Sequence, residues 1–304
     1  MSPDPASSAP VKSSPSRRRV FAMRLSSTIV LWLLLSLAII VKSPWVFFVM
    51  ITGIVAVAIK EYFRLFQDAG RRRFRWQTYV VGMLYTVALF APQFGYDLPW
   101  LREIDGAAIA LLVLLIILTR LNRPLEGIRT LDEITVAVFG FIYIAMLFGF
   151  LTKILGLDLV DGEGNDTARY YVLYLLAVTK FTDMGAYAIG SLIGKHKMVP
   201  HVSPGKTWQG FGGAIFGAFV ASYGSLAIFG DMIPLITPVH AAGLALALSL
   251  VAILGDLSES IIKRSVAAKD SGHKMPGIGG VLDLIDSVLF TAPVMYFYLV
   301  VIHP

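Results

Sequence analysis

Long apolar runs follow one another along most of the chain, and this pattern places the chain in a membrane. We expect spanning segments at residues 27–41, 45–59, 77–94, 106–121, 132–152, 170–194, 208–229, 237–259 and 284–302. Each run is continuous rather than alternating, which excludes a transmembrane barrel, whereas a helix satisfies its own backbone polar groups in lipid. The sequence therefore predicts an all-α fold, a polytopic integral membrane bundle of about nine transmembrane helices.

Composition restricts the chemistry that such a bundle can perform. Hydrophobic residues make up 56% of the 304 residues and charged residues only 15%, below the roughly one quarter usual in a soluble domain. The chain has no cysteine, which excludes disulfides, thiolate metal sites and thiol nucleophiles. A catalytic metal must therefore be held by oxygen atoms or by histidines, and the loop histidines occur singly, without the spacing of a zinc site.

The basic residues predict the orientation of the bundle. With a cytoplasmic N-terminus, the segments on that side hold 21 of the 26 Lys and Arg residues, the opposite side holds 4, and Lys180 lies inside a span. This bias is the one that the positive-inside rule describes. The polar segments 195–207 and 260–283 then face the cytoplasm, and residues 1–24 form a disordered basic cytoplasmic tail.

Acidic residues gather at the ends of the last two spans. Asp256 and Glu259 are three residues apart, as are Asp283 and Asp286, so each pair lies on one face of its helix. One loop joins the two helices, and the pairs can converge. Oxygen ligands alone at a membrane edge suit Mg²⁺. The alternative is a solvated helix-end network with the nearby basic residues, which are Lys263, Arg264, Lys269 and Lys274.

Two polar loops could bind an anion. The first, between the acidic pairs, contains Lys269-Asp270-Ser271-Gly272 and a glycine-rich stretch from Pro276 to Gly280. Glycines allow backbone amides to approach a phosphate, although an ordinary turn before a helix can be just as rich in glycine. In the second, Ser203-Pro204 before Gly205-Lys206-Thr207 predicts the start of a helix with exposed amides. A P-loop is excluded, because Pro200 stands where its first glycine would be.

Two further features lie inside spans. Lys180 and Asp183 are three residues apart in one apolar run, and the pair is either structural or faces a substrate. Gly213 and Gly217 have the spacing of small residues that let two membrane helices approach closely, so we assign them to packing.

The segment SIIKRSVAAKDSGHKMPGIGGVLDLIDS, from Ser260 to Ser287, resembles the signature of the phosphatidate cytidylyltransferase (CDP-diacylglycerol synthase) family. Two positions depart from that signature: Ile278 replaces a histidine and Leu284 replaces an arginine. The stretch TDMGAYAIGSLIGKHKMVPHVSPGKTWQG is similar to a second block of the family, with Gln209 where glutamate is common. The resemblance covers the chain from Tyr170 onward. We accordingly divide it into the tail, an N-terminal transmembrane scaffold (25–169) and a C-terminal transmembrane catalytic region (170–304).

The resemblance implies a Mg²⁺-dependent transfer of cytidylate from CTP to phosphatidate, giving CDP-diacylglycerol and pyrophosphate for phospholipid biosynthesis. The partners would be CTP, phosphatidate and membrane lipids, with no nucleic acid, and a homodimer is allowed for. The location would be a bacterial cytoplasmic membrane, with the active site on its cytoplasmic side. Asp256 and Asp283 are the first choice of metal ligands, with Asp286 and Glu259 next.

The resemblance also implies roles for the polar residues around the acids. The expected catalytic residues are Asp256, Asp283, Asp286, Lys263 and Lys269. The expected substrate-binding residues are Ser203, Lys206, Thr207, Asp183, Ser260, Arg264, Asp270, Gly279 and Gly280.

Three other functions fit parts of the sequence. A related CTP-dependent enzyme could act on an isoprenoid or ether lipid, as a polyprenol kinase or CDP-archaeol synthase does. A membrane transporter could use Lys180 and Asp183 as substrate or proton sites, although the polar residues cluster on one side instead of at the midplane. An inactive homologue would account for the departures at Ile278 and Leu284.

Overall fold

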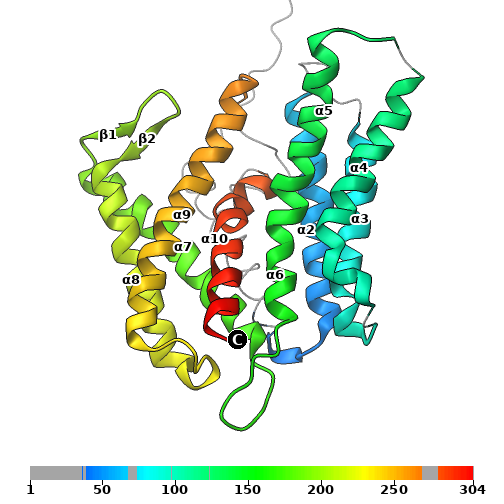
Figure 1. The fold of residues 1–304 in the computed structure, drawn as a ribbon. Helices are drawn as coiled ribbons and strands as arrows, with labels where there is room; N and C mark the ends of the chain where they lie inside the picture. The colour runs from blue at the N-terminus through cyan, green and yellow to red at the C-terminus, as the bar shows by residue number, and fades with distance from the viewer. Residues whose placement is uncertain are drawn as a thin grey trace, which may run out of the picture.

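The computed structural model describes residue 36 and residues 39–67, 74–96, 98–122, 124–268 and 280–303. Helices dominate this part of the chain (Figure 1). They are α2 (Pro44–Leu65), α3 (Arg75–Phe90), α4 (Ile104–Leu121), α5 (Ile128–Gly140), α6 (Leu147–Leu155), α7 (Ala168–Ile193), α8 (Trp208–Phe229), α9 (Pro238–Ser265) and α10 (Val281–Ile302). A π-helical turn, Phe141–Met146, joins α5 to α6.

The predicted membrane bundle is confirmed. Among the described residues, seven helical stretches are long and apolar enough to cross a membrane. They are Pro44–Leu65, Pro99–Leu121, Ile128–Leu155, Ala168–Ile193, Trp208–Met232, Pro238–Ser265 and Val281–Ile302. Helix α3, with 16 residues, occupies the third predicted span, and the first predicted span lies mostly outside the described residues. The predicted break before α2 is present, with Lys42 at a positive φ of 54° and Pro44 in the first turn of the helix.

Helix α10 lies at the centre of the bundle. It packs against α9 and α7 on one side and against α6 and α2 on the other, so it joins the two halves of the chain (Figure 1). Its buried side chains, from Val281 to Leu299, are mostly aliphatic, which suits a helix with neighbours on several faces. The N-terminal end of α10 is held by contacts with α2, α7 and α9.

Helices α7 and α8 approach each other along a line of glycines. A Cβ atom added at Gly185 would collide with the carbonyl oxygen of Gly213, and one added at Gly217 would collide with the carbonyl oxygen of Phe181. The predicted packing role of Gly213 and Gly217 is confirmed. This close contact holds α7 and α8 against each other, and we call the layer that these two helices form the α7–α8 wall.

A β-hairpin interrupts the helical pattern between α7 and α8. Strands β1 (Lys197–Val199) and β2 (Ser203–Thr207) pair antiparallel, with Lys197 opposite Thr207. The prediction that Ser203-Pro204 begins a helix is therefore wrong. Helix α8 begins only at Trp208, where the Thr207 side chain accepts a hydrogen bond of 3.1 Å from the amide of Gly210. Pro204 is tolerated because the strand lies at the edge of a two-stranded sheet.

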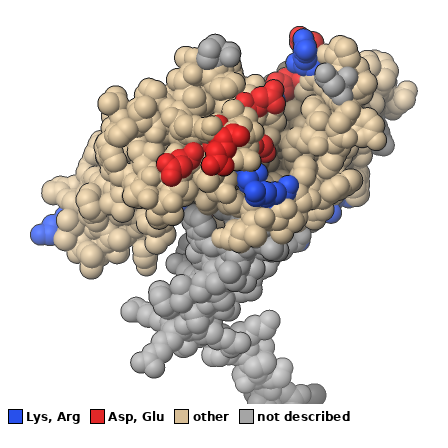
Figure 2. All heavy atoms as spheres, turned by 90° about the horizontal axis from the view of Figure 1, so that it is seen from below, with Lys and Arg blue, Asp and Glu red and all other residues tan. Residues whose placement is uncertain are grey.

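The lower end of the bundle carries a group of acidic side chains. The hairpin, the C-terminal end of α9 and the N-terminal end of α10 lie toward the upper end in Figure 1, and the C-terminus lies at the lower end. Figure 2 shows the lower face, where Asp and Glu side chains gather and few Lys or Arg side chains are visible. From α2 onward the described helices alternate in direction as the predicted topology requires, and which end faces the cytoplasm stays a prediction.

Candidate active site

A cleft of about 650 Å³ opens between α7, the hairpin, α8, α9 and α10. Its acidic residues are Asp183, Asp256, Glu259, Asp283 and Asp286, and its basic residues are Lys206 and Lys263. Ser203 and Thr207 also line it. Residues that the sequence places more than 100 positions apart thus converge, as the two acidic pairs were expected to do.

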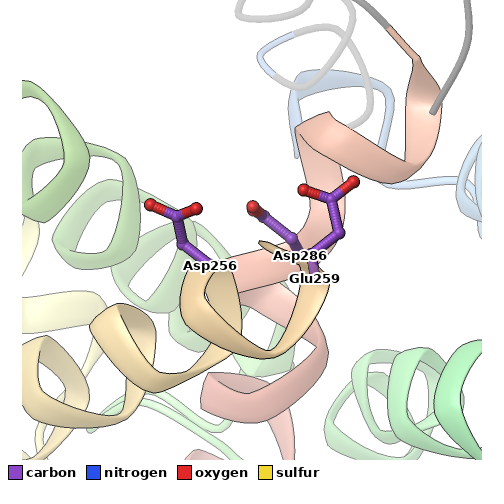
Figure 3. A group of neighbouring side chains, drawn as sticks. All are labelled: Asp256, Glu259 and Asp286. Atoms are coloured by element: carbon purple, nitrogen blue, oxygen red, sulfur yellow. The ribbon is translucent and has the colours of Figure 1, made fainter. Parts of the chain in front are cut away.

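Three carboxylates form the centre of this cleft. Asp256 and Glu259 project from α9, and Asp286 projects from α10, as Figure 3 shows. One oxygen atom from each lies within 4.8 Å of the others. Glu259 is 1% exposed and Asp286 is 6% exposed, whereas Asp256 is half-buried. The spacing of three residues on α9 puts both of its acids on the face that meets α10.

Close contact between the helix backbones brings these acids together. Gly255, next to Asp256, packs against the turn of α10 that carries Asp286. A Cβ atom at Gly255 would lie 2.6 Å from the carbonyl oxygen of Asp286 and 2.9 Å from the Cα atom of Ser287. Only glycine leaves room for this approach, since real Cβ atoms do not come that close to backbone atoms.

Lys263 joins the two acidic pairs. Its Nζ atom donates to Glu259 Oε2 at 2.7 Å and to Asp283 Oδ1 at 2.8 Å. The other oxygen of Asp283 accepts a hydrogen bond of 2.6 Å from the amide of Gly280, which satisfies a free amide at the start of α10. Both oxygens of Asp283 are therefore engaged, and its metal role stays a prediction.

Lys206 fastens the hairpin to α9. Its Nζ atom lies 2.9 Å from Asp256 Oδ2 and donates to the carbonyl oxygen of Ile253 at 3.2 Å. The side chain is largely buried within the cleft, with 19% of it exposed. The hairpin thus brings a positive charge to the carboxylates of α9. The expected role of Lys206 in binding substrate phosphates stays a prediction.

Asp183 connects α7 to α10. Its Oδ1 atom accepts from Ser287 Oγ at 3.2 Å, and its Oδ2 atom lies 3.4 Å from Lys180 Nζ. Lys180 also donates to the carbonyl oxygen of Leu284 at 2.7 Å. These contacts confirm the structural alternative for the pair. Asp183 also lines the cleft, and its role toward a substrate stays a prediction.

Other predicted residues lie around the cleft or outside the described part of the chain. Ser260 is half-buried on α9, Gly280 is buried at the start of α10, and Arg264 is exposed, with its Nε atom 3.5 Å from the carbonyl oxygen of Val202. None of these three lines the cleft. Lys269, Asp270, Ile278 and Gly279 lie outside the described residues.

Sequence reasoning missed Glu61. This residue lies in α2, is 1% exposed, and accepts a hydrogen bond of 3.1 Å from the amide of Leu282 in the first turn of α10. The sequence signal was an isolated acid at the end of an apolar run, directly after Lys60. Several basic residues follow it in the sequence, so the pattern favours a surface ion pair over a buried contact with α10.

The donor set fits a divalent cation. Among the described residues, five carboxylates in and beside the cleft face the ammonium groups of Lys180, Lys206 and Lys263, which leaves an excess of two negative formal charges. Glu259 Oε1 is buried and has no hydrogen-bond partner among the described residues. A buried carboxylate oxygen without a donor is costly unless a cation binds it. Asp256, Glu259 and Asp286 are the residues that could hold Mg²⁺.

Comparison with known proteins gives a consistent set of relatives. The profile described as the cytidylyltransferase family matches residues 22–302. A phosphatidate cytidylyltransferase of Bacillus subtilis (strain 168) is 38% identical over 201 residues, which are 65% of this chain and 70% of that protein. One of Staphylococcus aureus (strain COL) is 39% identical over 138 residues, which are 45% of this chain and 52% of that protein. An uncharacterized protein of Escherichia coli (strain K12), YnbB, is 44% identical over 131 residues, 42% of each chain.

Proposed function

Because the chain belongs to the cytidylyltransferase family, we propose that it transfers cytidylate from CTP to phosphatidate, giving CDP-diacylglycerol and pyrophosphate. The family makes the chain a nucleotidyltransferase, and its long apolar helices make it an integral membrane protein. The relatives named phosphatidate cytidylyltransferase support phosphatidate as the acceptor. The observation that carries the proposal is the combination, in one cleft, of three clustered carboxylates with two lysines.

The two lysines of the cleft are suited to bind phosphate oxygens. An ammonium group has three N–H donors. Lys206 uses two of them on Asp256 and Ile253, and Lys263 uses two on Glu259 and Asp283. By the contacts of the described residues, one donor of each lysine is left for a phosphate oxygen. Ser203 and Thr207 add hydroxyl groups on the hairpin side of the same cleft.

The transfer needs no nucleophile from the protein. An oxygen of the phosphatidate phosphate attacks the α-phosphorus of CTP, a new P–O–P bond forms, and the bond from that phosphorus to the β-phosphate oxygen breaks. Pyrophosphate leaves with the electron pair of the broken bond. The side chains position the two phosphates in line and neutralise charge, which is the main protein contribution to reactions of this type.

We include Mg²⁺ in the proposal. Asp256, Glu259 and Asp286 would hold it, and a bound Mg²⁺ supplies positive charge that offsets the charge on the phosphate oxygens. Asp283 is the further candidate ligand from the sequence. In the structure, Asp283 forms an ion pair with Lys263. Its negative charge is needed whether it binds Mg²⁺ or holds Lys263.

A cleft at the ends of the spans suits one soluble and one lipid substrate. The hairpin, the C-terminal end of α9 and the N-terminal end of α10 lie toward one end of the bundle (Figure 1), which supports a position near the membrane surface, where a lipid phosphate meets water. The basic bias of the segments at this end supports a cytoplasmic orientation, where CTP is available. We therefore propose that the cleft opens to the cytoplasm.

The test follows two labels of CTP through the reaction. Purified protein is incubated with phosphatidate and either α-labelled or γ-labelled CTP, with and without Mg²⁺. We expect the α-label in the lipid phase, the γ-label in pyrophosphate, and neither transfer without Mg²⁺. Transfer of the γ-label to a polyprenol would instead identify a lipid kinase. Transfer of the α-label only to an ether lipid would identify that lipid, not phosphatidate, as the acceptor. If a folded protein transfers nothing, Ile278→His with Leu284→Arg tests whether the two departures inactivate it.

A further inference from the structure

Lys180 is a basic residue near the middle of α7, a helix of 26 residues. Its side chain is 26% exposed and does not line the cleft. A charged side chain in the interior of a membrane helix is costly to keep and usually has a function. The proposed reaction assigns no role to this residue.

The strongest contact of Lys180 is with the backbone of α10, not with its neighbouring acid. Its Nζ atom donates to the carbonyl oxygen of Leu284 at 2.7 Å, whereas its distance to Asp183 Oδ2 is 3.4 Å. A lysine that served only to neutralise Asp183 would have the shorter contact with the carboxylate. The geometry points to a role in holding α10.

Lys180 and Asp183 form hydrogen bonds with α10 on both sides of Asp286. Lys180 binds the carbonyl oxygen of Leu284, two residues before Asp286, and Asp183 accepts from the hydroxyl of Ser287, one residue after it. Gly255 of α9 contacts the same turn from another direction. The turn that carries Asp286 is thus fixed by α7 and by α9.

We propose that Lys180 is a positioning residue which, together with Asp183, presets Asp286 beside Asp256 and Glu259. The importance of this role rests on the proposed function. In this role, Lys180 and Asp183 fix the geometry of the three carboxylates before any substrate binds. Residues that do not bind a metal themselves but hold its ligands in place often change metal affinity or activity by about 10-fold to 100-fold when they are removed. The positive charge alone makes the opposite prediction, because removing a cation from beside an acidic group strengthens its affinity for another cation.

The test measures Mn²⁺ binding by electron paramagnetic resonance, which needs no turnover. In Lys180→Ala, we expect the Mn²⁺ dissociation constant to rise about tenfold and kcat/KM for label transfer to fall about 100-fold. Propylammonium replaces the deleted atoms of the side chain, and we expect it to restore both in a saturable way. Tetramethylammonium has the charge but no N–H donor for Leu284, and we expect no effect.

Lys153→Ala is the matched control. Lys153 is a partly buried lysine on α6, 17% exposed, that is paired with Asp105 and does not line the cleft. We expect it to lower the melting temperature without changing Mn²⁺ affinity. If Lys180→Ala is not recovered folded, Lys180→Arg replaces it. Its charge is unchanged, but its longer planar head displaces the turn of α10, so Mn²⁺ binding is again expected to weaken.

Several outcomes would overturn the proposal. They are unchanged or tighter Mn²⁺ binding by the Lys180 variant, equal loss in Lys153→Ala, equal rescue by tetramethylammonium, or no Mn²⁺ binding by the wild-type protein. The proposed function is decided separately. Wild-type protein that binds Mn²⁺ but transfers no cytidylate would contradict that function, while the effect of Lys180 on binding could still be measured.

Discussion

The carboxylate of Glu61 accepts a hydrogen bond from the amide of Leu282, 221 positions later in the sequence. Glu61 is on α2, in the N-terminal half, and Leu282 is in the first turn of α10, one residue before Asp283. Backbone amides in the first turn of a helix lack partners within the helix, and an acid there also interacts favourably with the helix dipole. The N-terminal half thus helps to hold the part of α10 that enters the cleft.

Removal of this carboxylate should lower the stability of the protein. Glu61→Ala leaves a buried amide without its acceptor, and we expect a loss of about 1–3 kcal/mol in the free energy of unfolding. Glu61→Gln keeps an acceptor oxygen and should lose less. Denaturant titration in detergent measures the change, with the exposed Glu163 as the control position for an alanine substitution. Wild-type stability in Glu61→Ala would show that the hydrogen bond contributes nothing.

Asp283 should be essential for turnover through its charge. In Asp283→Asn the single side-chain oxygen can still accept from the Gly280 amide, but the amide NH2 cannot accept from Lys263. We therefore expect a loss of about 1–3 kcal/mol in stability and a loss of label transfer of at least about 100-fold. Asp283→Ala should lose turnover and about 1 kcal/mol more stability than Asp283→Asn, because the helix start also loses its acceptor. The label-transfer assay and denaturant titration separate the two effects. Turnover retained in Asp283→Ala would remove this residue from the site.

A methyl group at Gly255 should separate the acids of α9 from Asp286. The added Cβ meets backbone atoms of α10, and we expect Gly255→Ala to lose about 1–3 kcal/mol and to bind Mn²⁺ more weakly. Gly243 is the matched control on the same helix, since nothing lies within 4 Å of its added Cβ. Gly243→Ala should gain about 0.5–1 kcal/mol from the lower backbone entropy of alanine. Equal behaviour of the two variants would contradict the close approach of the helices.

Gln209 should hold the base of the hairpin that carries Lys206. Its Oε1 atom accepts from the amides of Lys195 and His196, both at 3.2 Å, and its Nε2 atom lies 2.7 Å from His196 Nδ1. In Gln209→Ala we expect these two amides to exchange with deuterium about tenfold faster, as the loss of roughly one hydrogen bond allows. The KM for CTP should rise more than kcat falls.

The control for this prediction is Gln77→Ala. Gln77 is another glutamine with a side-chain hydrogen bond, to Thr119, on helices that do not line the cleft. It should change neither the exchange of the hairpin amides nor the KM for CTP. Unchanged exchange at Lys195 and His196 in Gln209→Ala would show that the hairpin is held by its strand pairing alone.

The sequence predicts the helices and the convergence of the acids because both depend on local spacing. Apolar length defines a span, and a separation of three residues puts Asp256 and Glu259 on one face. The contact of α9 with α10 then follows from the single loop that joins them. The glycines at 213 and 217 were recognised for the same reason, since the spacing alone gives the packing face.

The parts that sequence reasoning missed depend on distant partners. Ser203-Pro204 reads as a helix start, but its backbone pairs with β1, a strand of only three residues that shows no alternating pattern. Glu61 gives no local sign that its partner is an amide on the last helix. Lys180 was expected to pair with Asp183, and its shorter bond to a backbone carbonyl of α10 depends on three-dimensional packing.

The line of contact between α7 and α8 has a consequence for how mutations in this protein are interpreted. In a saturation library, Gly185, Gly213 and Gly217 should tolerate substitution as poorly as Asp256 and Asp286, although none of the three bears a functional group. The glycine variants should disappear from the folded, membrane-inserted pool, whereas the aspartate variants should remain there and fail only in catalysis. Measuring the abundance and the activity of each variant in parallel would therefore separate the positions needed for packing in the α7–α8 wall from the positions needed for catalysis.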